Sequence, residues 1–121
     1  MKRNYKLKYH LRNYIKQELY DYNRNKQILE DLQKNILNIN TNPTINSKTL
    51  LIVSKKINSI EKVYNSLNKE EKEMFDIIFN KGCNQLYAKT YYNITKDMYY
   101  NAMNKIIYLT AVEYGQIWKG G

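Results

Sequence analysis

Apolar side chains recur at three- and four-residue intervals along most of this chain, and this spacing constrains the fold more than any other feature. The clearest stripe lies in residues 50–67 and consists of Leu50, Val53, Ile57, Ile60, Tyr64 and Leu67. Side chains with this spacing share one face of an α-helix, whereas a half-buried strand alternates apolar and polar residues. No segment shows that alternation, and there is no internal repeat. The sequence therefore predicts an all-α fold.

The same spacing divides the chain into three parts. It predicts a first helix over residues 9–39, in which the apolar stripe is broken at residues 21–26 by either a kink or a polar turn of helix. The only proline, Pro43, lies in a run of Asn, Thr and Ser that is typical of a linker. We therefore expect a basic helical arm (1–39), a linker (40–48) and a helical domain (49–121). The apolar stripe of the arm has three possible partners: the chain's own domain, a second arm, or another protein.

Local signals divide the expected domain into four helices, the first over residues 48–67. Asn68 and Glu71 have the spacing of a capping box, which begins a second helix that ends at Gly82. A short helix over residues 84–91 follows, and Asn93 tolerates the left-handed conformation of a tight turn. Thr95 then caps a long helix over residues 96–118. The expected inner face of this last helix consists of Met98, Ala102, Ile106, Leu109 and Val112.

The chain is strongly basic, with 20 Lys and Arg against 11 Asp and Glu and a formal net charge of +9. In a chain of 121 residues, such an excess favours a polyanionic partner, nucleic acid before membrane. An A·T-rich genome is another explanation, because its codons enrich Lys, Asn, Ile and Tyr without any functional cause. Charge alone leaves both explanations open.

Several classes of protein are not expected. A single Cys83 and a single His10 provide neither a disulfide framework nor a zinc site, and no histidine accompanies the carboxylates. We therefore expect no enzyme activity, no metal and no cofactor. The longest apolar run, residues 50–53, is too short to span a membrane, and no apolar run of a signal peptide follows the basic start. These features predict a cytoplasmic protein with no membrane partner.

A short helix followed closely by a longer one is the pattern of a helix-turn-helix motif, although a simple helical bundle would have the same spacing. In the motif, the first turns of the second helix enter the major groove of DNA. The residues expected to contact DNA are Thr95, Lys96, Tyr99, Tyr100, Asn101 and Asn104, with Lys105 nearer the backbone, and Lys89 of the short helix. Asn can bond adenine N6 and N7 together, and Tyr can contact a thymine methyl group, so this face suits an A·T-rich site.

A second basic region lies at the start of the chain, where residues 1–16 contain no acidic side chain. Its candidate phosphate contacts are Lys2, Arg3, Lys6, Lys8 and Arg12. The interleaved tyrosines Tyr5, Tyr9 and Tyr14 favour a nucleic-acid-binding arm. The alternative is an ordinary solvated helix face, which is the usual meaning of a run of charges.

Three segments carry a family resemblance. They are residues 13–37 (NYIKQELYDYNRNKQILEDLQKNIL), 67–82 (LNKEEKEMFDIIFNKG) and 94–107 (ITKDMYYNAMNKII). The first contains Tyr-Ile, Glu-Leu-Tyr-Asp-Tyr, a Lys and two spaced Leu, and it resembles the arm of the RinA family of phage late-gene transcriptional activators. The other two are similar to that family's Leu-x-x-Glu-Glu helix and to its recognition helix. The family in turn resembles the ArpU-type regulators and, in its carboxy-terminal half, region 4 of sigma factors.

The resemblance implies a sigma region 4-like helix-turn-helix domain that binds promoter DNA in the bacterial host cell. With the Asn–Tyr face described above, the expected partner is A·T-rich promoter DNA. It also implies a transcriptional activator of phage or prophage late genes that acts with host RNA polymerase, with a homodimer as one possible state. Two alternatives stay open. One is a phage DNA-binding protein of another role, such as a small terminase subunit. The other is a protein-binding regulator that has lost contact with DNA, because the recognition helix is only weakly basic.

Overall fold

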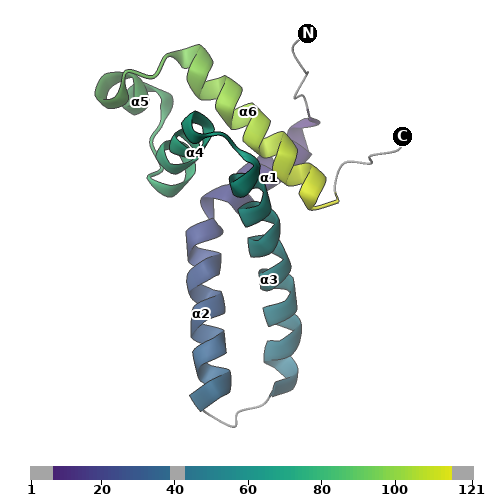
Figure 1. Ribbon diagram of the computed structural model, residues 1–121. Helices are drawn as coiled ribbons and strands as arrows, with labels where there is room; N and C mark the ends of the chain where they lie inside the picture. The colour runs from purple at the N-terminus through teal and green to yellow at the C-terminus, as the bar shows by residue number, and fades with distance from the viewer. Residues whose placement is uncertain (1–6, 39–42, 116–121) are drawn as a thin grey trace.

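The computed structural model describes residues 7–38 and 43–115, with the side chains of residues 7–34 and 50–115. Helices make up nearly all of this part of the chain and no strand occurs in it, so the predicted all-α fold is confirmed. The helical elements in chain order are α1 (Tyr9–Tyr20), α2 (Tyr22–Asn38), α3 (Pro43–Ser66), α4 (Lys69–Phe75), the π-helical η1 (Asp76–Asn80), α5 (Gln85–Tyr92) and α6 (Lys96–Glu113) (Figure 1).

The helix expected over residues 9–39 is two helices that meet at Asp21. Helical hydrogen bonds continue through the junction, where the Asp21 amide donates to the Gln17 carbonyl at 2.9 Å and the Asn25 amide donates to the Asp21 carbonyl at 2.8 Å. The chain nevertheless changes direction, since α1 packs on α6 whereas α2 runs beside α3 (Figure 1). Of the two interpretations of the interrupted stripe, the kink is therefore correct.

α2 and α3 form a two-helix hairpin that extends away from the other helices (Figure 1). α3 begins at Pro43, earlier than the expected residue 48. Proline suits the first turn of a helix, because the N–H group that it lacks would have no helical partner there. Residues 43–48 of the expected linker therefore belong to α3, and residues 40–42 lie outside the described part of the chain.

The hydrophobic core is shared by α1 and the carboxy-terminal helices. Ile15 and Leu19 of α1 are fully buried in the same cluster as Ile60 of α3, Ile78 of η1 and Ile107 of α6. Burial of one such side chain stabilises the fold by about 1.5–3 kcal/mol. For α1, the apolar stripe of the arm thus packs on the chain's own domain.

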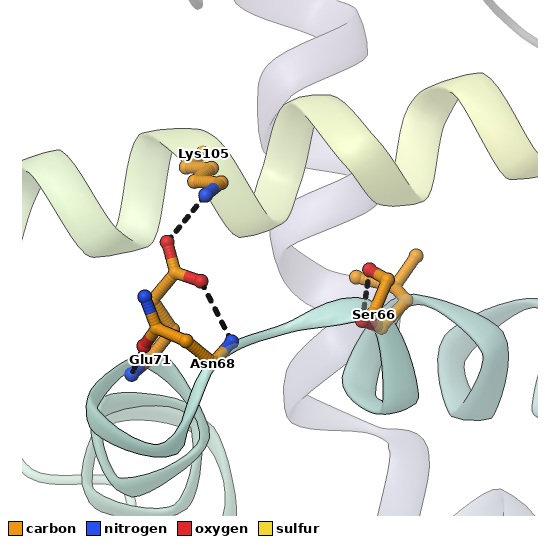
Figure 2. A network of polar contacts seen from close by, with 5 residues as sticks. Ser66, Asn68, Glu71 and Lys105 are labelled. Carbon is orange, nitrogen blue, oxygen red and sulfur yellow. Dashed lines mark hydrogen bonds and ion pairs between the residues drawn. The ribbon is translucent and has the colours of Figure 1, made fainter.

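The predicted capping box is present at the start of α4. The Asn68 side chain accepts a hydrogen bond from the Glu71 amide at 2.8 Å, and the Asn68 amide donates to the Glu71 carboxylate at 2.9 Å (Figure 2). These two bonds satisfy amides that the first turn of a helix would otherwise leave unpaired.

α4 continues into the π-helical turn η1, where the Lys81 amide donates to the Asp76 carbonyl at 2.8 Å. Three consecutive side chains of this turn, Ile77, Ile78 and Phe79, are buried. Gly82 follows with a φ of +68°, which is the left-handed conformation that glycine adopts without strain. The predicted end of this helical run at Gly82 is confirmed.

Candidate nucleic-acid interface

α5 and α6 are joined by a three-residue turn with the local features of a helix-turn-helix. Asn93 adopts the left-handed conformation (φ 56°, ψ 34°), as its position in the sequence predicted. The next residue, Ile94, is buried, and its amide donates to the Ala88 carbonyl at 3.2 Å. Thr95 caps α6 by accepting a hydrogen bond from the Met98 amide at 3.1 Å. The turn therefore sets α5 against the first turns of α6, at one end of the molecule (Figure 1).

Tyr99 is buried, which makes its expected contact with DNA wrong. Only 3% of the residue is exposed, and its hydroxyl donates to the Cys83 carbonyl at 2.7 Å. Burial raises the pKa of Tyr99, and the neighbouring Tyr20 hydroxyl raises it further. This tyrosine thus fastens α6 to the segment before α5 and does not face a ligand.

The inner face of α6 is rotated from the one expected. Met98 is 52% exposed, whereas the buried positions of α6 are Tyr99, Met103, Ile106, Ile107, Thr110 and Ala111. Both Met98 and Tyr99 begin an apolar series at helical spacing, so spacing alone does not choose between them. On the inner side, Met103, Ile106 and Ile107 join the core, and the Cys83 carbonyl accepts the buried Tyr99 hydroxyl.

Asn104 and Arg12, expected to contact a base and a phosphate respectively, bind each other. The Arg12 guanidinium donates from Nη2 to Asn104 Oδ1 at 3.0 Å, and the same nitrogen lies 3.8 Å from the sulfur of Met103. Bidentate recognition of adenine requires both Oδ1 and Nδ2 of an asparagine. The bond from Arg12 uses one of the two lone pairs of Oδ1, so the expected contact of Asn104 with a base stays a prediction, and Arg12 connects α1 to α6.

Lys105 is also committed within the protein. Its ammonium forms an ion pair with the Glu71 carboxylate, which at the same time accepts the Asn68 amide (Figure 2). Burial acts to raise the pKa of Glu71, but the hydrogen bonds from Lys105 and Asn68 outweigh it, so the pKa is lowered. The Lys105 side chain thus holds α6 against the start of α4, and its expected backbone contact stays a prediction.

The remaining candidates are exposed. Lys96, Tyr100 and Asn101 lie on the outer side of the first two turns of α6, and Lys89 lies on α5. Tyr100 is 39% exposed, with its ring edge-on to that of Tyr99 at 5.2 Å between centroids. Thr95 is exposed at the turn, although its hydroxyl is used in the cap. On α6 these exposed residues share the surface of the first two turns with the acidic Asp97.

α5 adds an exposed aromatic surface that the sequence analysis did not include. The large exposed side chains of α5 are Leu86, Tyr87, Tyr91 and Tyr92. The rings of Tyr87 and Tyr91 lie 4.4 Å apart, and Lys81 approaches the Tyr92 hydroxyl to 3.3 Å. The tyrosine-rich segment QLYAKTYY was the sequence pattern that indicated this surface. In the structure, Ala88 is the sole buried residue of α5.

The amino-terminal basic run is only partly described. Lys8 is exposed just before α1, where a basic side chain is free to contact a polyanion. Lys2, Arg3 and Lys6 lie outside the described residues, so their expected phosphate contacts stay predictions. Among the predicted cationic contacts in the described residues, Lys8, Lys89 and Lys96 are exposed, whereas Arg12 and Lys105 are partly buried and paired within the protein.

The carboxylates are engaged in structural pairs or spread over the surface. Glu18 is buried, and Lys56 Nζ lies 2.8 Å from its carboxylate, with the Tyr114 hydroxyl at 3.5 Å. Within residues 7–38 and 43–115, no three His, Cys, Asp or Glu side chains converge as metal ligands would. None of the helices described combines the length and apolar character needed to cross a bilayer.

Comparison of the chain with protein-family models, curated proteins and solved structures finds no match.

Proposed function

We propose that this chain binds double-stranded DNA with the outer side of α5 and the first two turns of α6. Lys89 and Lys96 would neutralise phosphates, while Tyr100 and Asn101 would contact base edges in the major groove. The observation that carries this proposal is the exposure of Lys96, Tyr100 and Asn101, which follow directly after a capped three-residue turn.

The biological role that we propose is activation of phage or prophage late genes together with host RNA polymerase. Its support is the resemblance of residues 13–37, 67–82 and 94–107 to the RinA family, and the net charge of +9. An Asn–Tyr face without arginine suits an A·T-rich promoter, because arginine is the usual partner of guanine. The exposed tyrosines of α5 are suitably placed to contact the DNA backbone, which the first helix of the motif crosses.

The direct experiment is fluorescence anisotropy of the full chain with an A·T-rich duplex and a G·C-rich duplex of equal length, over a series of salt concentrations. We expect tighter binding to the A·T-rich duplex and a linear loss of log affinity with log salt. Each neutralised phosphate contributes about 0.9 to that slope. The double variant Lys89→Ala, Lys96→Ala should bind more weakly with a shallower slope, whereas the exposed Lys34→Ala on α2 should match the parent.

A second candidate function is regulation through protein contact without DNA. The weakly basic character of the start of α6 favours it. Arg12 and Lys105 are paired with Asn104 and Glu71 within the protein. The acidic Asp97 is exposed next to Lys96. Absence of binding to either duplex at low salt would support this candidate and contradict the first.

Light scattering on the purified chain addresses the small terminase alternative, since a large ring would favour that role and a monomer or dimer would favour the regulator.

A further inference from the structure

A cleft of about 350 Å³ lies where the α2–α3 hairpin meets the junction of α4 and η1. Its walls include Tyr22, Lys26, Glu61, Tyr64, Phe75 and Asp76. The volume is near the lower end of the range for small-ligand sites, which is about 300–1,000 Å³. We infer that this cleft binds an organic ammonium group, held between tyrosine rings and two carboxylates.

Two tyrosine rings of the lining pack against the same phenylalanine ring. Tyr22 and Tyr64 stand nearly perpendicular to Phe75, at interplanar angles of 85° and 78°, with centroid distances of 6.4 Å and 5.2 Å. The faces of such rings carry negative electrostatic potential and attract cations within about 6 Å. Tyr64 already attracts one, because the Lys72 ammonium lies 5.5 Å from its centroid.

Two carboxylates reinforce this preference. Asp76 accepts hydrogen bonds from Asn80 at 2.6 Å and from the Tyr64 hydroxyl at 3.4 Å, so its charge is fixed beside the ring. Glu61 lines the cleft with an exposed side chain. Burial raises the pKa of Tyr22, and the nearby charge of Glu61 raises it further.

The lining of the cleft is richer in carboxylates than the molecule as a whole. Glu61, Asp76 and one lysine, Lys26, line it, and Lys72 lies at the Tyr64 ring without being a lining residue, whereas the whole chain carries a net charge of +9. A phosphate or carboxylate ligand would meet two like charges here, whereas both carboxylates attract a cation. A cation with apolar substituents satisfies both the carboxylates and the rings.

This chemistry has two possible sources: a free organic amine, or a lysine side chain of a partner protein. The test is a titration of the full chain, followed by amide proton–nitrogen correlation spectra, with choline, with the uncharged tert-butyl analogue of choline, and with butylammonium as a lysine mimic. We expect saturable shifts around Tyr22, Glu61 and Asp76 with the cations, and binding about tenfold weaker for the uncharged analogue. Stronger binding of choline indicates a free quaternary amine, and stronger binding of butylammonium indicates a lysine side chain.

Variants make the assignment specific. Tyr22→Leu and Glu61→Gln should each weaken cation binding about fivefold to tenfold, whereas Glu70→Gln, at an exposed carboxylate outside the cleft, should leave it unchanged. Glu61 is exposed, so its substitution tests the site even where Tyr22→Leu disturbs folding. Equal binding of choline and its uncharged analogue, unchanged binding by Glu61→Gln, or no saturable shift at the cleft overturns the inference. DNA binding plays no part in this experiment.

Discussion

Arg12 on α1 donates a hydrogen bond to Asn104 on α6 across 92 positions of sequence, at 3.0 Å. This bond connects the first described helix to the predicted recognition helix. It pairs within the protein one residue expected to contact a base and one expected to contact a phosphate. The two side chains therefore serve to fix α1 and α6 relative to each other.

Substitution of Arg12 should affect stability more than DNA binding. We expect Arg12→Ala to lower the free energy of unfolding in urea by about 1 kcal/mol, because a partly buried, charge-assisted hydrogen bond is lost. Arg24→Ala is the matched control, since the Arg24 side chain is 71% exposed and its pairing with Asp21 is worth at most about 1 kcal/mol. A salt slope of DNA binding reduced by about 1 in Arg12→Ala, with unchanged stability, would instead indicate a phosphate contact.

Two adjacent lysines on α3 should differ sharply in their contribution to stability. Lys56 lies 2.8 Å from the buried carboxylate of Glu18, whereas Lys55 is exposed. Lys56→Ala leaves a buried charge without its ionic partner, so we expect a loss of about 2 kcal/mol in urea denaturation. Lys55→Ala should change stability by less than about 0.5 kcal/mol. Equal effects of the two substitutions would show that Glu18 does not depend on Lys56.

The capping glutamate should make stability sensitive to acid. The pKa of Glu71 is lowered from its usual 4.5, so its contribution is fully present above pH 4.5 and is lost as the pH falls through the folded-state value. We expect Glu71→Gln to be less stable than the parent at neutral pH and to lose less stability on acidification. The measurement is urea denaturation at a series of pH values from neutral to acid. Glu70→Gln, at the exposed neighbour on the same turn, should follow the parent curve more closely.

Locally encoded features could be predicted from the sequence. Five residues act through hydrogen bonds or backbone dihedral angles within a few positions of themselves, and each behaves as expected. They are Asn68, Glu71, Gly82, Asn93 and Thr95. Such features depend on short-range geometry, which is fixed by the residues themselves.

Features that depend on distant residues could not be predicted. The inner face of α6 depends on the Cys83 carbonyl that receives the Tyr99 hydroxyl, and the sequence does not indicate that these groups meet. The same is true of Lys105, whose partner Glu71 belongs to another helix. Lysine and asparagine on a predicted recognition helix can bond to DNA or to other parts of the protein. The sequence therefore does not show which of the candidate DNA-binding residues are paired within the fold.

The exposed start of α6 leads to a prediction that separates affinity from selectivity. Asn101→Ala should reduce discrimination between the preferred site and a site with one altered A·T pair by about 1–3 kcal/mol, because a bidentate contact with adenine is lost. Lys96→Ala should weaken binding to both sites alike and lower the salt slope by about 1, because a phosphate contact carries no sequence information. Both quantities come from anisotropy titrations of the full chain with matched duplexes at several salt concentrations. Asn58→Ala, an exposed amide on α3, serves as the control and should match the parent in affinity and in selectivity. Parent-like behaviour of both Asn101→Ala and Lys96→Ala would mean that α6 does not lie in the major groove.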